Sequence, residues 1–194
     1  MYGATASHPP PAHQEHHLSI ILGYDPTTLR EKVDLLAAGK RLDELGEMRS
    51  LDALNEKAGL LRLVGRLDEA LDVANQALRQ ARFTGERQDA ALARARRAQV
   101  LQFQGKLDDA HVELSAVIGE AHAHDWSRTE AFALQHRGKV LFDQSELEAA
   151  LADFKAALAL RESLGLPPNE LESSLVAIAV TESFLDERRR TARQ

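Results

Sequence analysis

The sequence predicts an all-α protein: a right-handed superhelical array of antiparallel helix hairpins, with further helices at both ends. Three observations predict it. Alanine and leucine, both strong helix formers, make up nearly a third of the 194 residues, with 31 Ala and 30 Leu. A pattern of apolar and small residues recurs at a spacing of 40 residues. Glycine or serine divides each unit in two, as expected for a tight turn between paired helices.

The repeat is clearest in three short segments: GRLDEAL at 65–71, GKLDDAH at 105–111 and SELEAAL at 145–151. Helical periodicity on both sides of each segment predicts two helices per unit. The first helices are expected at 50–64, 87–104 and 127–143. The second helices are expected at 67–82, 107–123 and 147–163. Gly65, Gly105 and Ser145 then occupy the turns, and the units span 50–86, 87–126 and 127–166.

The second helices share an alanine in the same register, at Ala70, Ala110 and Ala150. A small side chain at a helix crossing lets the two helix axes approach closely. One hairpin cannot bury its apolar face alone, so neighbouring hairpins must stack. We therefore expect these three alanines to be buried at helix crossings.

The two ends of the chain lie outside the repeat. Residues 1–17 are rich in proline and histidine and are expected to form a disordered tail. Residues 18–24 are a short apolar run that fits either a helix or a strand. Asp25-Pro26 fits an N-cap followed by a first-turn proline, which predicts a helix over 26–40 within a helical segment 18–49. A C-terminal helix is expected over 168–188, in a capping segment 167–189 that a basic tail at 190–194 follows.

Composition and missing motifs exclude several classes of function. The chain has no cysteine, so it can form no disulfide. Its net charge of −6 argues against general binding to nucleic acid or to an acidic membrane. It has no apolar run long enough to span a membrane and no signal-peptide pattern, which favours a cytoplasmic location. Phosphate-binding, nucleophile-elbow and zinc-binding motifs are absent. We predict no enzyme, no catalytic residue, no cofactor and no metal site.

The repeated residues resemble those of the tetratricopeptide repeat (TPR) family, in its long-repeat variant. The resemblance covers residues 50–163 and rests on a set of framework positions, which in the first unit are Ala58, Leu61, Gly65, Ala70, Ala74 and Ala77-Leu78. It implies a binding function, because members of that family generally hold a partner peptide or helix in a concave groove lined by the first helices.

Carried over position by position, the resemblance implies a groove that presents polar, basic and aromatic side chains: Asn55, Arg62, Arg96, Gln99, Phe103, Phe132, His136, Lys139 and Phe142. The basic residues would form a positive strip that favours an acidic peptide. The alternative is that they are solvated charges whose aliphatic stems cover apolar neighbours. The three phenylalanines are either exposed anchors for a peptide or packing residues between hairpins.

The C-terminal helix contains six successive apolar residues, 175–180. One interpretation is that the larger of the apolar residues on this helix face the array: Leu171, Leu175, Ile178 and Leu185. The other is that Val176 and Val180, four positions apart on one stripe, form a self-complementary surface for a second copy of the chain. That interpretation predicts a homodimer.

Two functions fit the predicted groove. The first is a protein–protein interaction module, an adaptor or scaffold that binds a peptide or helix of another protein. The second is a regulatory protein that senses a peptide and acts on a separate effector.

Overall fold

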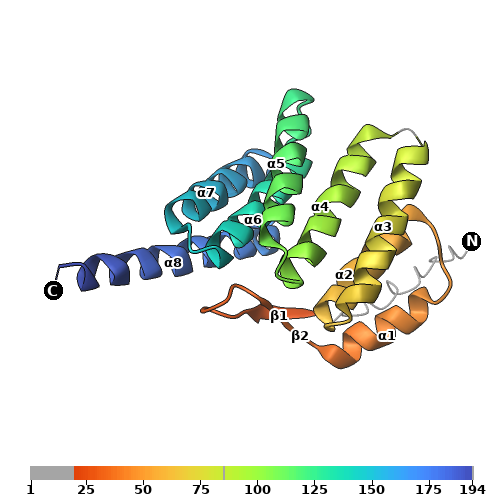
Figure 1. Cartoon of the computed structure of the whole chain (residues 1–194), viewed down its shortest axis with the longest axis horizontal. Helices are drawn as coiled ribbons and strands as arrows, with labels where there is room; N and C mark the ends of the chain where they lie inside the picture. Colours follow the sequence, from red (N-terminus) through yellow and green to blue (C-terminus); the bar gives the residue numbers. More distant parts are fainter. Residues whose placement is uncertain (1–19, 85, 194) are drawn as a thin grey trace, which may run out of the picture.

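The computed structural model of the chain describes residues 20–84 and 86–193, so the predicted tail at 1–17 lies outside the described residues. In the described part, two strands precede eight helices (Figure 1). The elements are β1 (Ile21–Tyr24), β2 (Glu31–Val33), α1 (Leu35–Leu45), α2 (Leu51–Leu63), α3 (Leu67–Thr84), α4 (Arg87–Phe103), α5 (Leu107–Ala123), α6 (Ser127–Asp143), α7 (Leu147–Ser163) and α8 (Pro168–Thr191). Consecutive helices from α2 to α8 pack against each other, so the fold is an all-α array of helix hairpins.

The hairpins turn where the repeat predicts. The bounds of the pairs α2–α3, α4–α5 and α6–α7 agree with the predicted ranges to within two residues. Gly65, Gly105 and Ser145 stand in the three turns with φ angles of 80°, 76° and 65°. This left-handed conformation reverses the chain after a helix and has little steric cost for glycine. Ser145 adopts the same conformation without being glycine.

Small residues set the packing between the helices of each unit. Ala70, Ala110 and Ala150 are each 0% exposed, which confirms the prediction for all three. In the third unit, Gly138 replaces the alanine that α2 and α4 carry at the corresponding position, and the ring of Phe154 packs against it. The core is therefore divided among neighbouring hairpins rather than gathered at one centre.

The 40-residue period extends to polar contacts between hairpins. Arg97 forms an ion pair with Glu113 in its own unit and a 3.1 Å hydrogen bond to Asn75 of the preceding unit. Forty residues later, Arg137 pairs with Asp153 at 2.7 Å and donates to Ser115 at 3.2 Å. These repeated contacts link each hairpin to the one before it.

Alternate helices form a continuous layer, which we call the inner layer. In it α2 contacts α4, α4 contacts α6, and α6 contacts α8. The β1–β2 hairpin lies alongside these helices, between the α2 end of the array and α8 (Figure 1). The two strands are antiparallel and pair Ile21 with Val33 and Tyr24 with Glu31.

The prediction of a helix over 26–40 was wrong. Asp25 does cap a turn, because its Oδ1 accepts hydrogen bonds from the backbone N–H groups of Thr27 and Thr28 at 2.9 and 2.8 Å. That turn ends at Leu29, whose φ of 55° reverses the chain into β2. Helix α1 begins only at Leu35, where Asp34 accepts a 3.0 Å bond from the N–H of residue 37. The local cap signal is real, but it stabilises one turn instead of a helix.

The C-terminal helix α8 extends to Thr191, so the first residues of the expected basic tail belong to it. Its fully buried face consists of Ser174, Ala177, Thr181 and Leu185. Leu175, which one of the two interpretations placed against the array, is 51% exposed. Within residues 20–84 and 86–193, no helix combines the length and the apolar character that crossing a membrane requires.

Candidate functional site

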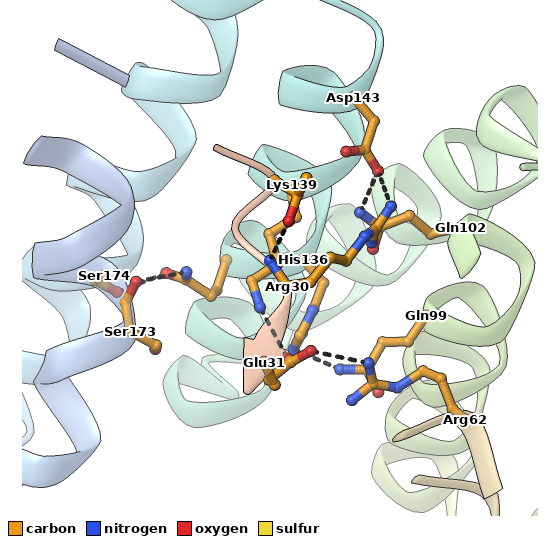
Figure 2. Close-up of polar contacts among 12 residues, drawn as sticks. Arg30, Glu31, Arg62, Gln99, Gln102, His136, Lys139, Asp143, Ser173 and Ser174 are labelled. Atoms are coloured by element: carbon orange, nitrogen blue, oxygen red, sulfur yellow. Dashed lines mark hydrogen bonds and ion pairs between the residues drawn. The ribbon is translucent and has the colours of Figure 1, made fainter. Parts of the chain in front are cut away.

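The candidate site lies where the β1–β2 hairpin meets the inner layer. Side chains from β2, α2, α4, α6 and α8 converge there (Figure 2). We call this surface of the inner layer the groove, since it carries the residues that the TPR resemblance assigned to a groove. The groove holds an extended segment of the chain itself.

Glu31, the first residue of β2, supplies the central contact. Its Oε2 accepts a 3.1 Å hydrogen bond from Nη1 of Arg62, and its Oε1 accepts a 2.9 Å bond from Nζ of Lys139 (Figure 2). All three side chains are 6–7% exposed. One carboxylate therefore joins α2 to α6 across the groove.

Burial and the neighbouring charges shift the pKa of Glu31 in opposite directions, and the same is true of Lys139. Burial alone would raise the pKa of Glu31, but the charges of Lys139 and Arg62 hold it well below its usual range. Burial lowers the pKa of the Lys139 ammonium, and the neighbouring Glu31 carboxylate partly offsets that effect. The carboxylate is therefore ionised at neutral pH.

A second ion pair holds the hairpin at the end of α6. Nη2 of Arg30 donates to Oδ2 of Asp143 at 2.7 Å, and the side-chain amide of Gln102 donates to the same oxygen at 2.7 Å (Figure 2). The guanidinium groups of Arg30 and Arg62 lie 4.2 and 4.4 Å from the ring centroid of Phe103. Two cations therefore cover this ring, and Phe103 packs under the hairpin.

An apolar contact anchors the turn of the hairpin. Leu29 is 2% exposed and belongs to the core cluster of Ala150, Phe154 and Ala177. Phe142 packs against the same cluster and makes an edge-to-face contact with Phe184 at 5.4 Å. Phe142 is therefore a packing residue rather than an exposed peptide anchor.

Buried polar side chains on α6 extend the site toward α4 and α8. The Gln99 amide lies 2.5 Å from Nε2 of His136. Ser174 donates a 2.6 Å hydrogen bond to Oε1 of Gln135 (Figure 2). Burial lowers the pKa of His136 well below its usual value, and the Lys139 charge adds to that effect. His136 is therefore neutral at neutral pH.

Arg96 differs from the other two basic residues of the predicted strip. In the described part of the chain, no carboxylate forms an ion pair with it, and its Nε is buried without a hydrogen-bond partner. Its guanidinium lies 5.5 Å from the ring centroid of Phe132. Burial lowers the pKa of Arg96 and the nearby Arg62 lowers it further, while the carboxylates of Asp52 and Glu56 partly offset both effects. Arg96 is a cation that the hairpin does not neutralise.

The structure brings together most of the predicted groove residues, but few of them are open to solvent. Asn55 is 8% exposed and its Oδ1 is buried without a partner. Phe132 is half-buried and packs against His136 at 4.6 Å. Reversing the charges of Arg62 and Lys139 would place new carboxylates beside Glu31, so it would disturb the fold as well as any binding.

Sequence reasoning missed the hairpin residues of the site, Leu29, Arg30 and Glu31, because it placed them in a helix. A strand signal was present: β-branched and aromatic residues over 20–24, followed by Asp25-Pro26-Thr27-Thr28, a run of turn-forming residues. Of the residues proposed for self-association, Val180 packs against the core cluster that contains Leu29, and Val176 is half-buried.

Comparisons with known proteins establish the fold and no more. No protein-family model matches the chain, and no curated protein sequence matches it. Among solved structures, the crystal structure of BtubC (BKLC) from P. vanneervenii is similar, with a TM-score of 0.58 and 18% sequence identity. The likeness covers 81% of this chain and 67% of BtubC. At this identity it supports the helical array alone.

Proposed function

We propose that the chain is a TPR-type interaction module, an adaptor or scaffold, whose groove binds an acidic extended segment of another protein. The observation that supports this proposal is the binding of Glu31 by Arg62 and Lys139. A strand of the chain itself presents a carboxylate to the inner layer. A partner segment with a carboxylate at the same place would meet the same two cations. This role is one of binding and involves no chemical reaction.

The proposal requires the partner to replace the hairpin. Two buried cations without an acid would be costly, so any segment that enters the groove must supply a carboxylate. The hairpin precedes α1, and the array from α2 to α8 follows it, so its departure would leave the order of the stacked hairpins unchanged. The hairpin is thus a bound ligand on the same chain, which a stronger acidic ligand would displace.

The same geometry favours the peptide-sensing regulator as the second candidate. A partner that competes for Arg62 and Lys139 would release residues 20–34 from the groove. The released segment could then contact an effector protein. Partner binding exposes residues 20–34 to proteolysis in both candidates. The regulator is therefore distinguished from a passive scaffold by an effector protein that binds residues 20–34 only when the partner is present.

The direct test uses the full chain with a weakened hairpin. Leu29→Ala with Glu31→Gln removes both the apolar anchor and the central carboxylate. We expect a labelled peptide of residues 20–34 to bind this double variant, measured by fluorescence anisotropy. It should bind the unaltered chain far more weakly, because a ligand on the same chain acts at an effective concentration of the order of millimolar.

A peptide of the same length with Gln at position 31 is the matched control, and it should bind much less tightly than the Glu31 peptide. Proteins captured by the double variant and released by the Glu31 peptide would be candidate partners. If neither peptide binds the double variant, the groove is not a peptide site and the proposal is wrong.

A further inference from the structure

The hairpin does not fill the groove. A cavity of about 420 Å³ remains between it and the inner layer, within the size range of sites for small molecules. Ile21 and Tyr24 of the hairpin form part of its wall, with Leu60 of α2 and Phe132 of α6. The cavity therefore exists with the hairpin in place.

The charges that line the cavity do not balance. Its basic residues are Arg62, Arg96, Lys139 and Arg161, and its acidic residues are Glu31 and Glu56. Glu31 is bound by two of the bases, and both carboxylate oxygens of Glu56 accept hydrogen bonds from Arg41, which lies outside the lining. Four positive charges therefore face two negative charges that are already paired. His136 adds no charge at neutral pH, because burial lowers its pKa.

Arg96 is the group that this excess leaves without an ion-paired acid in the described residues. Asp52 and Glu56 act on it only through space, where they partly offset the lowering of its pKa by burial. Arg161 also lacks a carboxylate in the described residues, but it donates to the hydroxyls of Ser173 and Ser174 at 2.8 and 2.9 Å. Arg96 has a ring beneath it and a buried Nε with no partner. Arg96 is half-buried, and a partly desolvated guanidinium without a bound anion is costly, so an anion that reaches it gains a strong interaction.

We propose that this cavity binds a carboxylate joined to an apolar group, with the carboxylate on Arg96. The planar guanidinium matches a carboxylate in two parallel hydrogen bonds. Isoleucine, leucine, tyrosine and phenylalanine side chains in the wall suit an aliphatic or aromatic body. The acid is either a free small molecule or the carboxyl terminus of a peptide.

A ligand in this cavity differs from the partner segment described above. The partner segment would replace the hairpin, whereas the cavity needs the hairpin as part of its wall. A ligand here would fix the hairpin in the groove instead of releasing it. The two proposals therefore predict opposite effects on the hairpin and can fail independently.

The test is isothermal titration calorimetry of the unaltered full chain with 3-phenylpropanoate, and with its neutral amide as the matched ligand control. We expect the acid to bind and the amide to bind at least tenfold more weakly. A tetrapeptide that ends in phenylalanine, with a free or an amidated carboxyl terminus, forms the second pair. Tighter binding of the free tetrapeptide than of 3-phenylpropanoate would identify a peptide terminus as the source, and the reverse order a free acid.

The test variant is Arg96→Gln, and Arg94→Gln on the same helix is its control. Residues 94 and 96 point about 200° apart around α4, and Arg94 does not line the cavity. We expect Arg96→Gln to weaken binding of the acid at least tenfold and Arg94→Gln to leave it unchanged. Arg96→Lys, which keeps the charge but loses the planar fork, should fall between them. Circular dichroism checks that each variant is folded.

The proposal is overturned if neither acid binds the unaltered chain, or if both bind Arg96→Gln and Arg94→Gln equally well. Hydrogen exchange of residues 20–33 gives a second readout, since the acid should slow exchange in the hairpin. Faster exchange on adding the acid would mean that the ligand displaces the hairpin and that the cavity is not its site.

Discussion

The aromatic ring of Phe154 occupies the space where any residue other than glycine would place its Cβ at position 138. A Cβ built on Gly138 would lie 2.5 Å from Cε1 of Phe154, whose side chain is fully buried. In the first unit the corresponding pair is Ala58 with Ala74. The third unit thus has a glycine and a large ring where the first unit has two alanines. The large side chain on the second helix of the third unit is accommodated because the first helix has no side chain at that position.

This relationship predicts that Gly138→Ala destabilises the protein although alanine is the better helix former. Overpacking of a buried crossing costs about 1–3 kcal/mol, more than the 0.5–1 kcal/mol, roughly, that replacing a helical glycine returns. Urea denaturation of the full chain measures the free energy of unfolding. Gly119→Ala in α5 is the control, since nothing lies within 4 Å of its Cβ position, and it should stabilise.

A second variant, Phe154→Leu, tests whether the ring of Phe154 causes the destabilisation in Gly138→Ala. Phe154→Leu alone should destabilise by opening a cavity, but it should also relieve the contact with alanine at position 138. We therefore expect the two substitutions together to cost less than the sum of their separate effects. Strict additivity would show that Phe154 does not limit the side chain at position 138.

Glu31 predicts a loss of stability in acid. Its pKa in the folded protein is lowered from the ordinary value of 4.5, so the unfolded chain binds more protons than the folded one near that pH. The stabilisation is complete above the unfolded pKa and is lost as pH falls through the folded pKa. Between about pH 5 and pH 3, Glu31→Gln should therefore show a smaller fall in melting temperature than the parent protein. Glu187→Gln, at an exposed position of α8, should behave like the parent.

The lowered pKa of His136 predicts a separate loss of stability as pH falls, and this loss begins in a less acidic range than that of Glu31. Burial and the Lys139 charge lower its folded pKa well below the ordinary 6.5, so the unfolded chain again binds more protons. Its contribution is complete above the unfolded pKa and decreases as pH falls below it. Thermal melts between pH 7.5 and about pH 5 should show this decrease in the parent protein and not in His136→Gln. His111→Gln, on α5 and away from the cavity lining, is the control; an unchanged slope in His136→Gln would contradict the prediction.

The helix hairpins could be predicted from the sequence because their determinants are local and repeated. The turn residues Gly65, Gly105 and Ser145 and the crossing alanines recur at one spacing, so each unit supports the assignment of the others. Residues 21–33 occur once, and their local signals conflict. Asp25-Pro26 is a good helix start, but the fold of this segment depends on Leu29 reaching Ala150 and Ala177, which are more than a hundred residues away. No local pattern carries that information.

The candidate site also has a part that could be predicted from the sequence and a part that could not. The resemblance to the TPR family, carried over position by position, placed Arg62, Arg96 and Lys139 in one groove. The resemblance could not show that Glu31 forms ion pairs with two of them and that Arg96 forms none with the described residues. That difference depends on where the hairpin docks, and so does the part of the cavity wall that Ile21 and Tyr24 form.

The pairing of Glu31 with Lys139 predicts a large coupling between the two side chains. Glu31→Gln leaves Lys139 and Arg62 buried without an acid, and Lys139→Met leaves the carboxylate with one cation instead of two. Breaking a buried ion pair by removing one partner costs about 3–5 kcal/mol, whereas replacing both partners is often close to neutral. The remaining Arg62 should moderate the loss in Lys139→Met, so we expect Glu31→Gln to be the more destabilising of the two. In a double-mutant cycle measured by urea denaturation, the loss of unfolding free energy in the double variant should be smaller than the sum of the two single losses by roughly 1–3 kcal/mol.

The exposed pair Lys155 and Glu182, 2.8 Å apart, gives the reference cycle, where the coupling should stay below about 1 kcal/mol. A coupling no larger at Glu31 than at Glu182 would mean that the hairpin is held by its apolar anchor and not by charge.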